Sequence, residues 1–261
     1  MYRCPKCHEP LINNQHSYLC VNHHCYDIAK SGYVNLSLHQ KKAQGDNKEM
    51  IQARTEFLQQ GYYEPLQQRL IEIIQQYPSS FIIDAGCGQG YYTNAFAKAI
   101  PQCMYYGFDL SKSALKTAAK KADNVYYALA SIADLPLVDA CCDMVISIFA
   151  PIYEQEFNRI LKPGGYLLKV GPGPLHLWEL KQQLYEKVYE NKVPEHLKTM
   201  KLVSEESLQY EITIQDTQHI QALLMMTPYA YRTSQTAIQR LHTMKQLATT
   251  LAFYIQIWQK Q

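Results

Sequence analysis

The chain has 261 residues, of which 47% are hydrophobic, and a formal net charge of +2. This length suits one large α/β domain with a small appendage, and the apolar content excludes a largely disordered chain. A charge this small does not by itself indicate nucleic-acid binding. Because no run of about 18 apolar residues occurs and the N-terminus is polar, we expect a cytoplasmic protein with no membrane partner.

Cysteine and histidine residues are concentrated at the start of the chain. Four of the eight cysteines lie within the first 25 residues, as a pair formed by Cys4 and Cys7, then Cys20 and Cys25. In a reducing compartment such a cluster indicates metal ligands rather than disulfides. His24 and Cys25 are alternative fourth ligands, because both lie at a spacing from Cys20 that is typical of zinc sites. We therefore predict one structural Zn²⁺ that folds a knuckle of about 30 residues.

The segment after the knuckle is polar and then helical. Residues 38–48 are rich in polar side chains, which predicts a linker. Apolar residues then recur at helical spacing, which predicts helices over residues 49–60 and 65–76.

Short apolar runs alternate with helical stretches in the rest of the chain. We expect strands at FIIDAGCG, MYYGFDLS, VYYALAS, CDMVISIFAP and GYLLKVGP, with helices at YYTNAFAKAI and SKSALKTAAKKA. Two more strands are expected at LQYEITI and LAFYIQIWQ, with a helix at DTQHIQALLMM between them. Strands that alternate with helices predict a parallel sheet that is covered on both faces.

A glycine-rich loop, DAGCGQGYY, follows the first of these strands. Gly86, Gly88 and Gly90 allow a ligand to approach the backbone closely, and the next helix begins with free N–H groups. Their spacing differs from the G-x-G-x-x-G pattern of dinucleotide-binding proteins, so a dehydrogenase is the disfavoured alternative. Asp109, at the end of the next strand, is placed to accept both hydroxyls of a ribose.

The glycine loop and Asp84 before it resemble motif I of the class I S-adenosylmethionine-dependent methyltransferases. The resemblance implies that the loop holds the methionine part of the cofactor and that Asp109 holds its ribose. The GG turn in LKPGGYLL fits the same family. The expected fold is therefore α/β, with a Rossmann-like, seven-stranded, mostly parallel sheet and a small N-terminal zinc-binding knuckle.

Several segments together resemble one narrower family from Cys4 to about Trp258. They are the knuckle, SGYVNL, QARTEFLQQGYYEPL, GCGQGYYT, KPGGYLL and PGPLHLWELK. Proteins that share this order are the 23S rRNA (guanine-N1)-methyltransferases, which act on a hairpin near the peptide exit tunnel. The resemblance implies methyl transfer from S-adenosylmethionine to N1 of a guanine, with 23S rRNA as partner and a homodimer as the assembly. We divide the chain into a zinc-binding domain (1–36), a linker with a helix (37–60) and a methyltransferase domain (61–261).

The resemblance also implies roles for individual residues. Its metal pattern is three cysteines and a histidine, which favours His24 over Cys25. Tyr63 and His176 match positions that flank the cofactor, and Gly88 and Gln89 match the loop positions nearest to it. Further positions follow from class I enzymes: the adenine is expected beside Ser131 and Asp134.

The sequence defines the residues that bind the methyl acceptor less well than those that bind the cofactor. Stacking of a flipped-out guanine is expected from aromatic residues near the fourth strand or the glycine loop, namely Tyr91, Tyr92, Phe149 and Tyr153. The catalytic base is unknown, with His176 and Glu179 as candidates by position only. Candidates for phosphate contacts are Arg3, Lys6, His8, Lys41 and Lys42, although a single residue of this kind is more often only solvated. The alternatives are a methyltransferase of a small metabolite, with the knuckle as a cap, and a binding module without activity.

Overall fold

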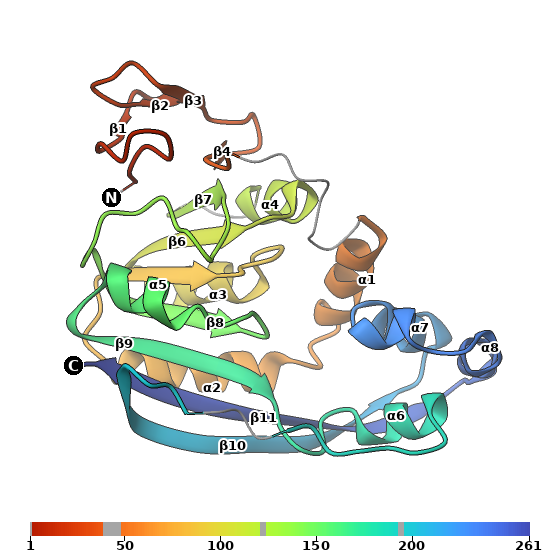
Figure 1. The fold of residues 1–261 in the computed structure, drawn as a ribbon. Helices are drawn as coiled ribbons and strands as arrows, with labels where there is room; N and C mark the ends of the chain where they lie inside the picture. The colour runs from red at the N-terminus through yellow and green to blue at the C-terminus, as the bar shows by residue number, and fades with distance from the viewer. Residues whose placement is uncertain (1, 39–47, 121–123, 193–195) are drawn as a thin grey trace.

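The computed structural model describes residues 2–38, 48–120, 124–192 and 196–261 (Figure 1). A small sheet near the N-terminus consists of β1 (Ile12–Asn13), β2 (Ser17–Leu19) and β3 (Cys25–Asp27). The strands of the large sheet are β4 (Tyr33–Asn35), β5 (Phe81–Ala85), β6 (Met104–Asp109), β7 (Val125–Leu129), β8 (Cys142–Ile148), β9 (Leu161–Pro172), β10 (Met200–Ile214) and β11 (Leu247–Lys260). The helices are α1 (Lys48–Leu58), α2 (Glu64–Gln75), α3 (Tyr91–Ala99), α4 (Lys112–Ala119), α5 (Glu154–Ile160), α6 (Trp178–Leu184), α7 (Thr217–Met225) and α8 (Gln235–Thr243), with a 3-10 turn at Pro228–Tyr231.

The large sheet runs in the order β10-β11-β9-β8-β5-β6-β7-β4. The strands from β9 to β4 are parallel to one another, whereas β11 is antiparallel to both β9 and β10. This order confirms the predicted class I methyltransferase architecture, with one difference in strand number. Among the described residues the sheet has eight strands instead of seven, because β4 pairs with β7 at the edge.

Each of the strands and helices that the sequence predicts is present, and most agree within a few residues at their ends. The last two strands are longer than predicted, because β10 already begins at Met200 and not at Leu208, and β11 at Leu247 and not at Leu251. Helices α5, α6 and α8 were not predicted. The predicted linker falls mostly on residues 39–47, which lie outside the described residues, and Lys48 already belongs to α1. The division into 1–36, 37–60 and 61–261 stays a prediction, and β4 connects its first segment to the large sheet.

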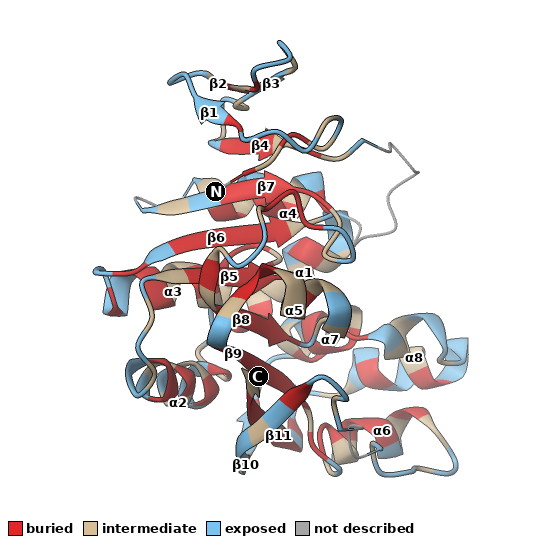
Figure 2. Cartoon of the chain, turned by 60° about the vertical axis from the view of Figure 1, so that its left-hand side comes forward, coloured by how far each residue is buried: buried red, intermediate tan, exposed pale blue. Residues whose placement is uncertain are grey.

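Alternate strand residues build two large cores, one on each face of the large sheet, and a third, smaller cluster joins β4 and β7 to α4. On one face Ile82 packs with Leu70 of α2 and Phe96 of α3. On the other face Ile83 belongs to a core that also contains Phe157 of α5 and Tyr18 of the small sheet. Figure 2 shows the central strands as buried, while edge strand β10 is largely exposed. The parallel strands are therefore covered on both faces, as expected for alternating β and α elements.

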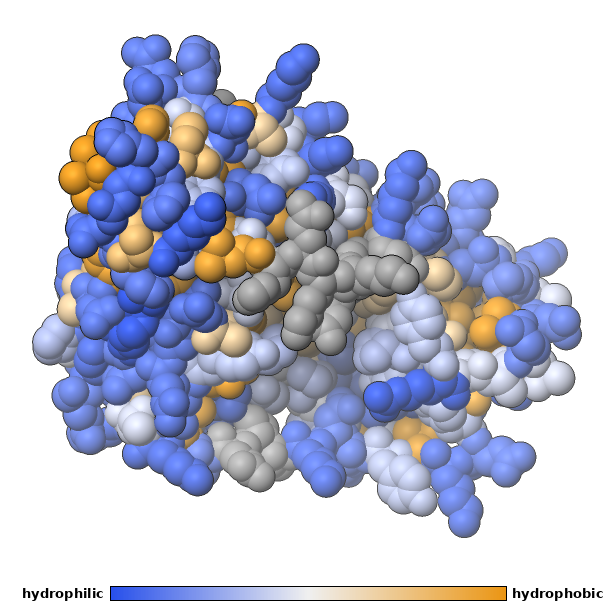
Figure 3. All heavy atoms as spheres, turned by 45° about the horizontal axis from the view of Figure 1, so that its top comes forward, coloured by the Kyte–Doolittle hydropathy of each residue, from blue (hydrophilic) through white to orange (hydrophobic). Residues whose placement is uncertain are grey.

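The small sheet lies beyond the β4 edge of the large sheet (Figure 1). The face of the molecule that carries it is mostly hydrophilic, with apolar side chains confined to small patches (Figure 3). Ile12 and Val21 are among the exposed apolar side chains of this region, at 72% and 71% exposure. Among the described helices none is both long and apolar enough to cross a membrane.

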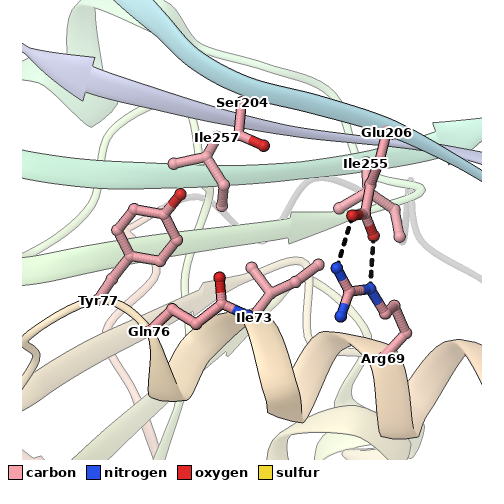
Figure 4. A pocket seen from close by; sticks show the side chains of 8 residues that line it. All are labelled: Arg69, Ile73, Gln76, Tyr77, Ser204, Glu206, Ile255 and Ile257. Atoms are coloured by element: carbon pink, nitrogen blue, oxygen red, sulfur yellow. Dashed lines mark hydrogen bonds and ion pairs between the residues drawn. The ribbon is translucent and has the colours of Figure 1, made fainter.

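A small pocket lies between α2 and the hairpin of β10 and β11 (Figure 4). The guanidinium of Arg69 donates to both carboxylate oxygens of Glu206 at its edge, each at 2.7 Å. The pocket is lined by Arg69, Ile73, Gln76, Tyr77, Ser204, Glu206, Ile255 and Ile257. None of these is a predicted site residue, so the candidate site is built from the glycine loop and its neighbours instead.

Candidate active site and zinc ribbon

The glycine loop connects the end of β5 to the start of α3. The N–H groups of Gly86 and Cys87 donate to the carbonyl oxygen of Phe108, at 2.9 and 3.0 Å, which holds the loop against β6. Gly90 is the N-cap of α3 and has a φ of 75°, a left-handed conformation that favours glycine. The loop therefore presents the first turn of α3 at the carboxyl ends of the parallel strands, where such folds bind ligands.

The three loop glycines differ in what a side chain would meet. A Cβ at Gly90 would lie 2.6 Å from the Tyr127 hydroxyl, and one at Gly86 would lie 2.6 Å from the Cβ of Ala150. A Cβ at Gly88 would meet nothing within 4 Å. Gly86 and Gly90 are therefore required by packing, whereas Gly88 borders open space that a cofactor can occupy.

Asp84 is buried at the end of β5, with 3% of its surface exposed. The hydroxyl of Thr93 donates to its Oδ2 at 2.5 Å. The pKa of Asp84 is raised to about 7, mainly by burial and to a smaller extent by the nearby Asp109, while the Thr93 hydrogen bond opposes both effects. This carboxylate joins β5 to α3 beneath the glycine loop.

Asp109 lies at the end of β6 and faces the loop. Its Oδ2 accepts a hydrogen bond from the Gly88 N–H at 2.9 Å, and its Oδ1 accepts one from the Ser111 N–H at 2.7 Å. The structure thus brings the predicted ribose acceptor into direct contact with the glycine nearest to open space. A carboxylate has further acceptor capacity beyond these two bonds, which suits it to a ribose diol.

Tyr63 and His176, which are 113 residues apart in the sequence, lie side by side. The Tyr63 hydroxyl is 3.4 Å from Nε2 of His176, and the Ala252 N–H donates to Nδ1 at 3.3 Å. A nitrogen that accepts from a backbone N–H carries no proton, so the ring proton is on Nε2 and points to Tyr63. Burial lowers the pKa of His176 to about 4, so the ring is neutral near pH 7.

Glu179, the other candidate base, is engaged by β11. Its carboxylate accepts hydrogen bonds from the N–H and the hydroxyl of Thr250, at 2.7 and 3.0 Å, and from the Thr249 hydroxyl at 3.2 Å. Burial alone would raise the pKa of Glu179, but these hydrogen bonds outweigh it and lower the pKa. A carboxylate held ionised by three donors is poorly suited to remove a proton.

Ser131 and Asp134 follow β7 in one loop. The Ser131 hydroxyl accepts from the Ala133 N–H at 3.2 Å. Asp134 has an 81% exposed side chain and lies 3.4 Å from Nη2 of Arg3. The structure therefore directs Asp134 toward the N-terminal segment, while Ser131 stays next to the strand end.

The proposed stacking residues lie in two different environments. Phe149 and Tyr153 are 45% and 41% exposed after β8. Phe149 belongs to an aromatic cluster, with its ring centroid 5.8 Å from that of His176 and 5.9 Å from that of Phe253. Tyr91 and Tyr92, at the start of α3, bury hydroxyl groups that have no hydrogen-bond partner in the described part of the chain. The structure thus gathers Phe149 with Tyr63 and His176, and places Tyr91 and Tyr92 against the core.

Cys4, Cys7, Cys20 and His24 come together in the N-terminal sheet, with all four ligand atoms within 4.8 Å of one another. Nδ1 of His24 is 3.4 Å from Sγ of both Cys4 and Cys20, and the sulfurs of Cys7 and Cys20 are 3.6 Å apart. Sulfurs bonded to zinc at about 2.3 Å in a tetrahedron are about 3.8 Å apart, so this donor set fits Zn²⁺. Cys25 is exposed and directs its sulfur to Asp27 at 3.8 Å.

Three of the five candidate residues for phosphate contacts lie among the described residues. Lys6 and His8 are exposed next to the ligand Cys7, whereas Arg3 is paired with Asp134. Lys41 and Lys42 lie outside the described residues.

Some contacts of the site were not predicted from the sequence. They are the hydrogen bond of Thr93 to Asp84, the hydroxyl of Tyr26 at 3.2 Å from Sγ of Cys4, and the packing of Phe253 on His176. Thr93 had a local signal, because a residue in the first turns of α3 can reach back to the end of β5. Tyr26 and Phe253 had none, since their partners Cys4 and His176 are distant in the sequence.

Comparison with known proteins matches both parts of the chain. A methyltransferase domain family covers residues 78–245, and a zinc-ribbon family described as "RlmA, N-terminal" covers residues 2–44. We therefore call residues 2–38, up to the end of the described N-terminal segment, the zinc ribbon.

Curated relatives match the chain over different lengths. The protein "Putative 23S rRNA (guanine-N(1)-)-methyltransferase YxjB" of Bacillus subtilis is 33% identical, over 100% of this chain and 97% of its own length. The "23S rRNA (guanine(748)-N(1))-methyltransferase" of Streptomyces fradiae is 35% identical over 68% of this chain, a match that spans 65% of that protein. A "Malonyl-[acyl-carrier protein] O-methyltransferase" of Hamiltonella defensa is 32% identical over only 38% of this chain. The chain therefore belongs to the zinc-containing, S-adenosylmethionine-dependent 23S rRNA (guanine-N1)-methyltransferase family.

Proposed function

We propose that this protein transfers the methyl group of S-adenosylmethionine to N1 of one guanine in a hairpin of 23S rRNA. The observation that carries the proposal is the full-length similarity to the Bacillus subtilis relative, which includes the ribbon as well as the methyltransferase domain. A relative that acts on an acyl-carrier protein matches only 38% of the chain. Similarity over the ribbon therefore favours an RNA substrate over a small metabolite.

The cofactor is assigned to the open space beside Gly88. We assign the methionine part to the loop of Asp84, Gly86, Gly88, Gln89 and Gly90. The support is that a Cβ at Gly88 would meet nothing, while Gln89 is buried at 6% exposure next to it.

The nucleoside part of the cofactor is assigned to the neighbouring strand ends. Asp109 holds the ribose and Ser131 holds the adenine, because both follow adjacent parallel strands at the same edge of the sheet. Tyr63 and His176 close the opposite side of the pocket.

The bound cofactor supplies a methyl group that is already activated by the positive sulfonium. The protein aligns the acceptor nitrogen with the methyl–sulfur bond, which converts the reaction into an intramolecular step. Because the N1 edge is the base-pairing edge, the guanine is unpaired and held against the partly exposed rings of Phe149 and Tyr153.

Neither candidate base is suited to remove the N1 proton. Both ring nitrogens of His176 are engaged, and the carboxylate of Glu179 accepts three hydrogen bonds. We assign His176 to the orientation of Tyr63 and Glu179 to the attachment of α6 to β11. The N1 proton leaves to solvent, which reaches the exposed Phe149 and Tyr153 side of the site.

We assign the binding of zinc and part of the RNA binding to the ribbon. We propose that Cys4, Cys7, Cys20 and His24 hold one Zn²⁺ and that exposed Lys6 and His8 contact phosphates. By the same family relation the protein forms a homodimer and works in the cytoplasm, where its RNA substrate is made. Mass measurement in solution tests the dimer directly.

The test is a methyl-transfer assay with labelled cofactor on unmodified 23S rRNA, followed by primer extension. N1-methylation blocks base pairing, so we expect label transfer and a primer-extension stop at one guanine. Label transfer without a stop would assign the methyl group to another atom. Absence of transfer to both naked and ribosomal RNA would favour the small-metabolite alternative.

A further inference from the structure

The N-terminal residues Tyr2 and Arg3 connect the zinc ribbon to the part of the site assigned to adenosine. Tyr2 forms an antiparallel bridge with Leu137, and the Arg3 N–H donates to the carbonyl oxygen of Pro136 at 2.9 Å. The side chain of Arg3 lies 3.4 Å from the carboxylate of Asp134. Two consecutive extended residues of the ribbon thus contact residues 134–137, in the loop that begins with Ser131.

Tyr2 also contacts the strand that carries Asp109. Its ring is 3% exposed and packs edge-on against Tyr106 and Phe108 of β6, with ring centroids 5.3 and 6.0 Å apart. Phe108 directly precedes Asp109, and its carbonyl oxygen accepts the N–H groups of the glycine loop. A single side chain from the ribbon therefore lies against β6 while its backbone pairs with the loop after β7.

The same two residues are held in the ribbon through the zinc ligands. Cys4 follows Arg3 directly and is fully buried. The Leu11 N–H donates to the Tyr2 carbonyl oxygen at 2.9 Å, and the Tyr2 ring packs on Tyr18 with centroids 5.1 Å apart. Cys20, a second member of the cluster, lies in the same core as Tyr2, Leu135 and Leu137. Bound Zn²⁺ would hold this segment closed through Cys4, because a ribbon of this size buries little apolar surface of its own.

We propose that Tyr2 and Arg3 are positioning residues through which bound zinc sets the affinity for the cofactor. This inference rests on the assignment of adenosine to Asp109 and Ser131 in the proposed function. Without zinc the segment 2–4 loses its anchor in the ribbon, so the loop 131–137 is held firmly only by α5. There, Glu156 and Arg159 still form hydrogen bonds with the backbone of Leu135. The loop is therefore loosened but not released, and the cofactor binds to a smaller population of competent molecules.

The experiment compares Cys7→Ser with Cys25→Ser, a matched loss of one thiol inside and outside the metal cluster. Zinc content, the Kd for S-adenosylhomocysteine by calorimetry, and amide hydrogen exchange are measured without RNA. For Cys7→Ser we expect loss of zinc, a Kd raised about tenfold, and faster exchange in residues 131–137 than in β10. Cys25→Ser is expected to keep zinc and the wild-type Kd.

A second pair of variants acts without removing a metal ligand. Tyr2→Ala is expected to raise the Kd with zinc retained, whereas Tyr2→Phe keeps the ring and restores the wild-type Kd. If zinc-free Cys7→Ser shows fast amide exchange along the whole chain, its Kd no longer reports on residues 131–137 alone. The comparison of Tyr2→Ala with Tyr2→Phe then tests the inference. The inference is overturned if zinc loss or Tyr2→Ala leaves the Kd unchanged, or raises it without faster exchange in residues 131–137.

Failure of the proposed function has a different signature. If wild-type protein binds S-adenosylhomocysteine in a zinc-dependent manner but does not methylate 23S rRNA, the RNA substrate is wrong and the inference holds. If wild-type protein does not bind S-adenosylhomocysteine at all, the cofactor assignment itself fails.

Discussion

The carboxylate of Asp109 already accepts two backbone hydrogen bonds, from Gly88 and Ser111, before any ribose is considered. Asp109→Ala is expected to raise the Kd for S-adenosylhomocysteine about thirtyfold, because hydrogen bonds to a charged group contribute about 2 kcal/mol. Asp109→Asn keeps the shape without the charge and should give a smaller increase. Calorimetry checks the Kd and circular dichroism the fold. An unchanged Kd in a folded Asp109→Ala protein would place the ribose elsewhere.

His176 predicts a pH dependence of stability. Its folded pKa of about 4 lies below the ordinary value of 6.5, so between these pH values the unfolded chain binds the extra proton. Stability from the neutral ring is complete above pH 6.5 and is lost as the pH falls toward 4, by about 3 kcal/mol in total. His176→Asn, which keeps an acceptor for the Ala252 N–H, should lose less stability over this window than wild type. Urea unfolding at pH 7 and pH 5 measures both proteins, and equal losses would contradict the prediction.

At the scale of elements, the glycine loop contains one glycine that packing requires, Gly90, and one that borders the proposed cofactor site, Gly88. Gly90→Ala forces a Cβ to within 3 Å of three side-chain atoms and should lower the free energy of unfolding by more than about 2 kcal/mol. Gly88→Ala meets no neighbour and should cost only about 1 kcal/mol for its left-handed φ of 53°. The Kd of Gly88→Ala for S-adenosylhomocysteine should nevertheless rise by more than this loss in the free energy of unfolding explains. Denaturant unfolding and calorimetry on both variants test this, and a Gly88→Ala protein with wild-type affinity would remove the loop from the pocket.

In the zinc ribbon, the geometry favours His24 over its neighbour Cys25 as the fourth zinc ligand. His24 points into the cluster from a turn in which His23 has a φ of 59°, while Cys25 begins β3 and faces outward. His24→Ala should therefore abolish zinc binding, and Cys25→Ser should leave one zinc per chain. Metal analysis of the purified proteins gives the answer. Zinc loss in Cys25→Ser with retention in His24→Ala would reverse the assignment.

Which elements could be predicted depended on their length and on local signals. Strand β5 and helix α4 were found from apolar runs, helical spacing and turn residues. Strand β4 has three residues, and helix α6 has seven and an N-cap residue, Leu177, that offers no capping side chain. Neither element is therefore long enough for its apolar periodicity to be recognised in the sequence. Helix α8 could have been found, because the Ser234 hydroxyl accepts the Ala237 N–H in an ordinary N-cap.

At the scale of the whole molecule, the site depends on contacts that no local pattern contains. Asp84, Gly88 and Asp109 could be predicted, because a strand, a tight loop and the next strand bring them together within 25 residues. Tyr63 and His176 meet across 113 residues, and Ala252, which donates its N–H to His176, lies on β11, the strand antiparallel to β9. The family resemblance marked Tyr63 and His176. The tautomer of His176 follows only from the hydrogen bond that the Ala252 N–H donates to Nδ1.

RNA binding is also a property of the whole molecule, since a net charge of +2 gives no general attraction for phosphates. Affinity then depends on where the cations lie, and Lys6 is an exposed lysine of the ribbon. Lys6→Ala should weaken binding to the 23S rRNA hairpin and lower the slope of log K against log salt by about 1. Lys98→Ala removes the same charge from the last turn of α3, at the end of that helix away from the glycine loop, and should change neither quantity.

Titration of RNA binding at several salt concentrations measures both variants, with the Kd for S-adenosylhomocysteine as a common reference. A local phosphate contact changes the salt slope of Lys6→Ala alone and leaves cofactor binding intact. Equal effects of Lys6→Ala and Lys98→Ala would mean that RNA senses only the total charge. In that case the ribbon would act on the cofactor site through Tyr2 and Arg3 without gripping RNA, and RNA recognition would have to come from the methyltransferase domain.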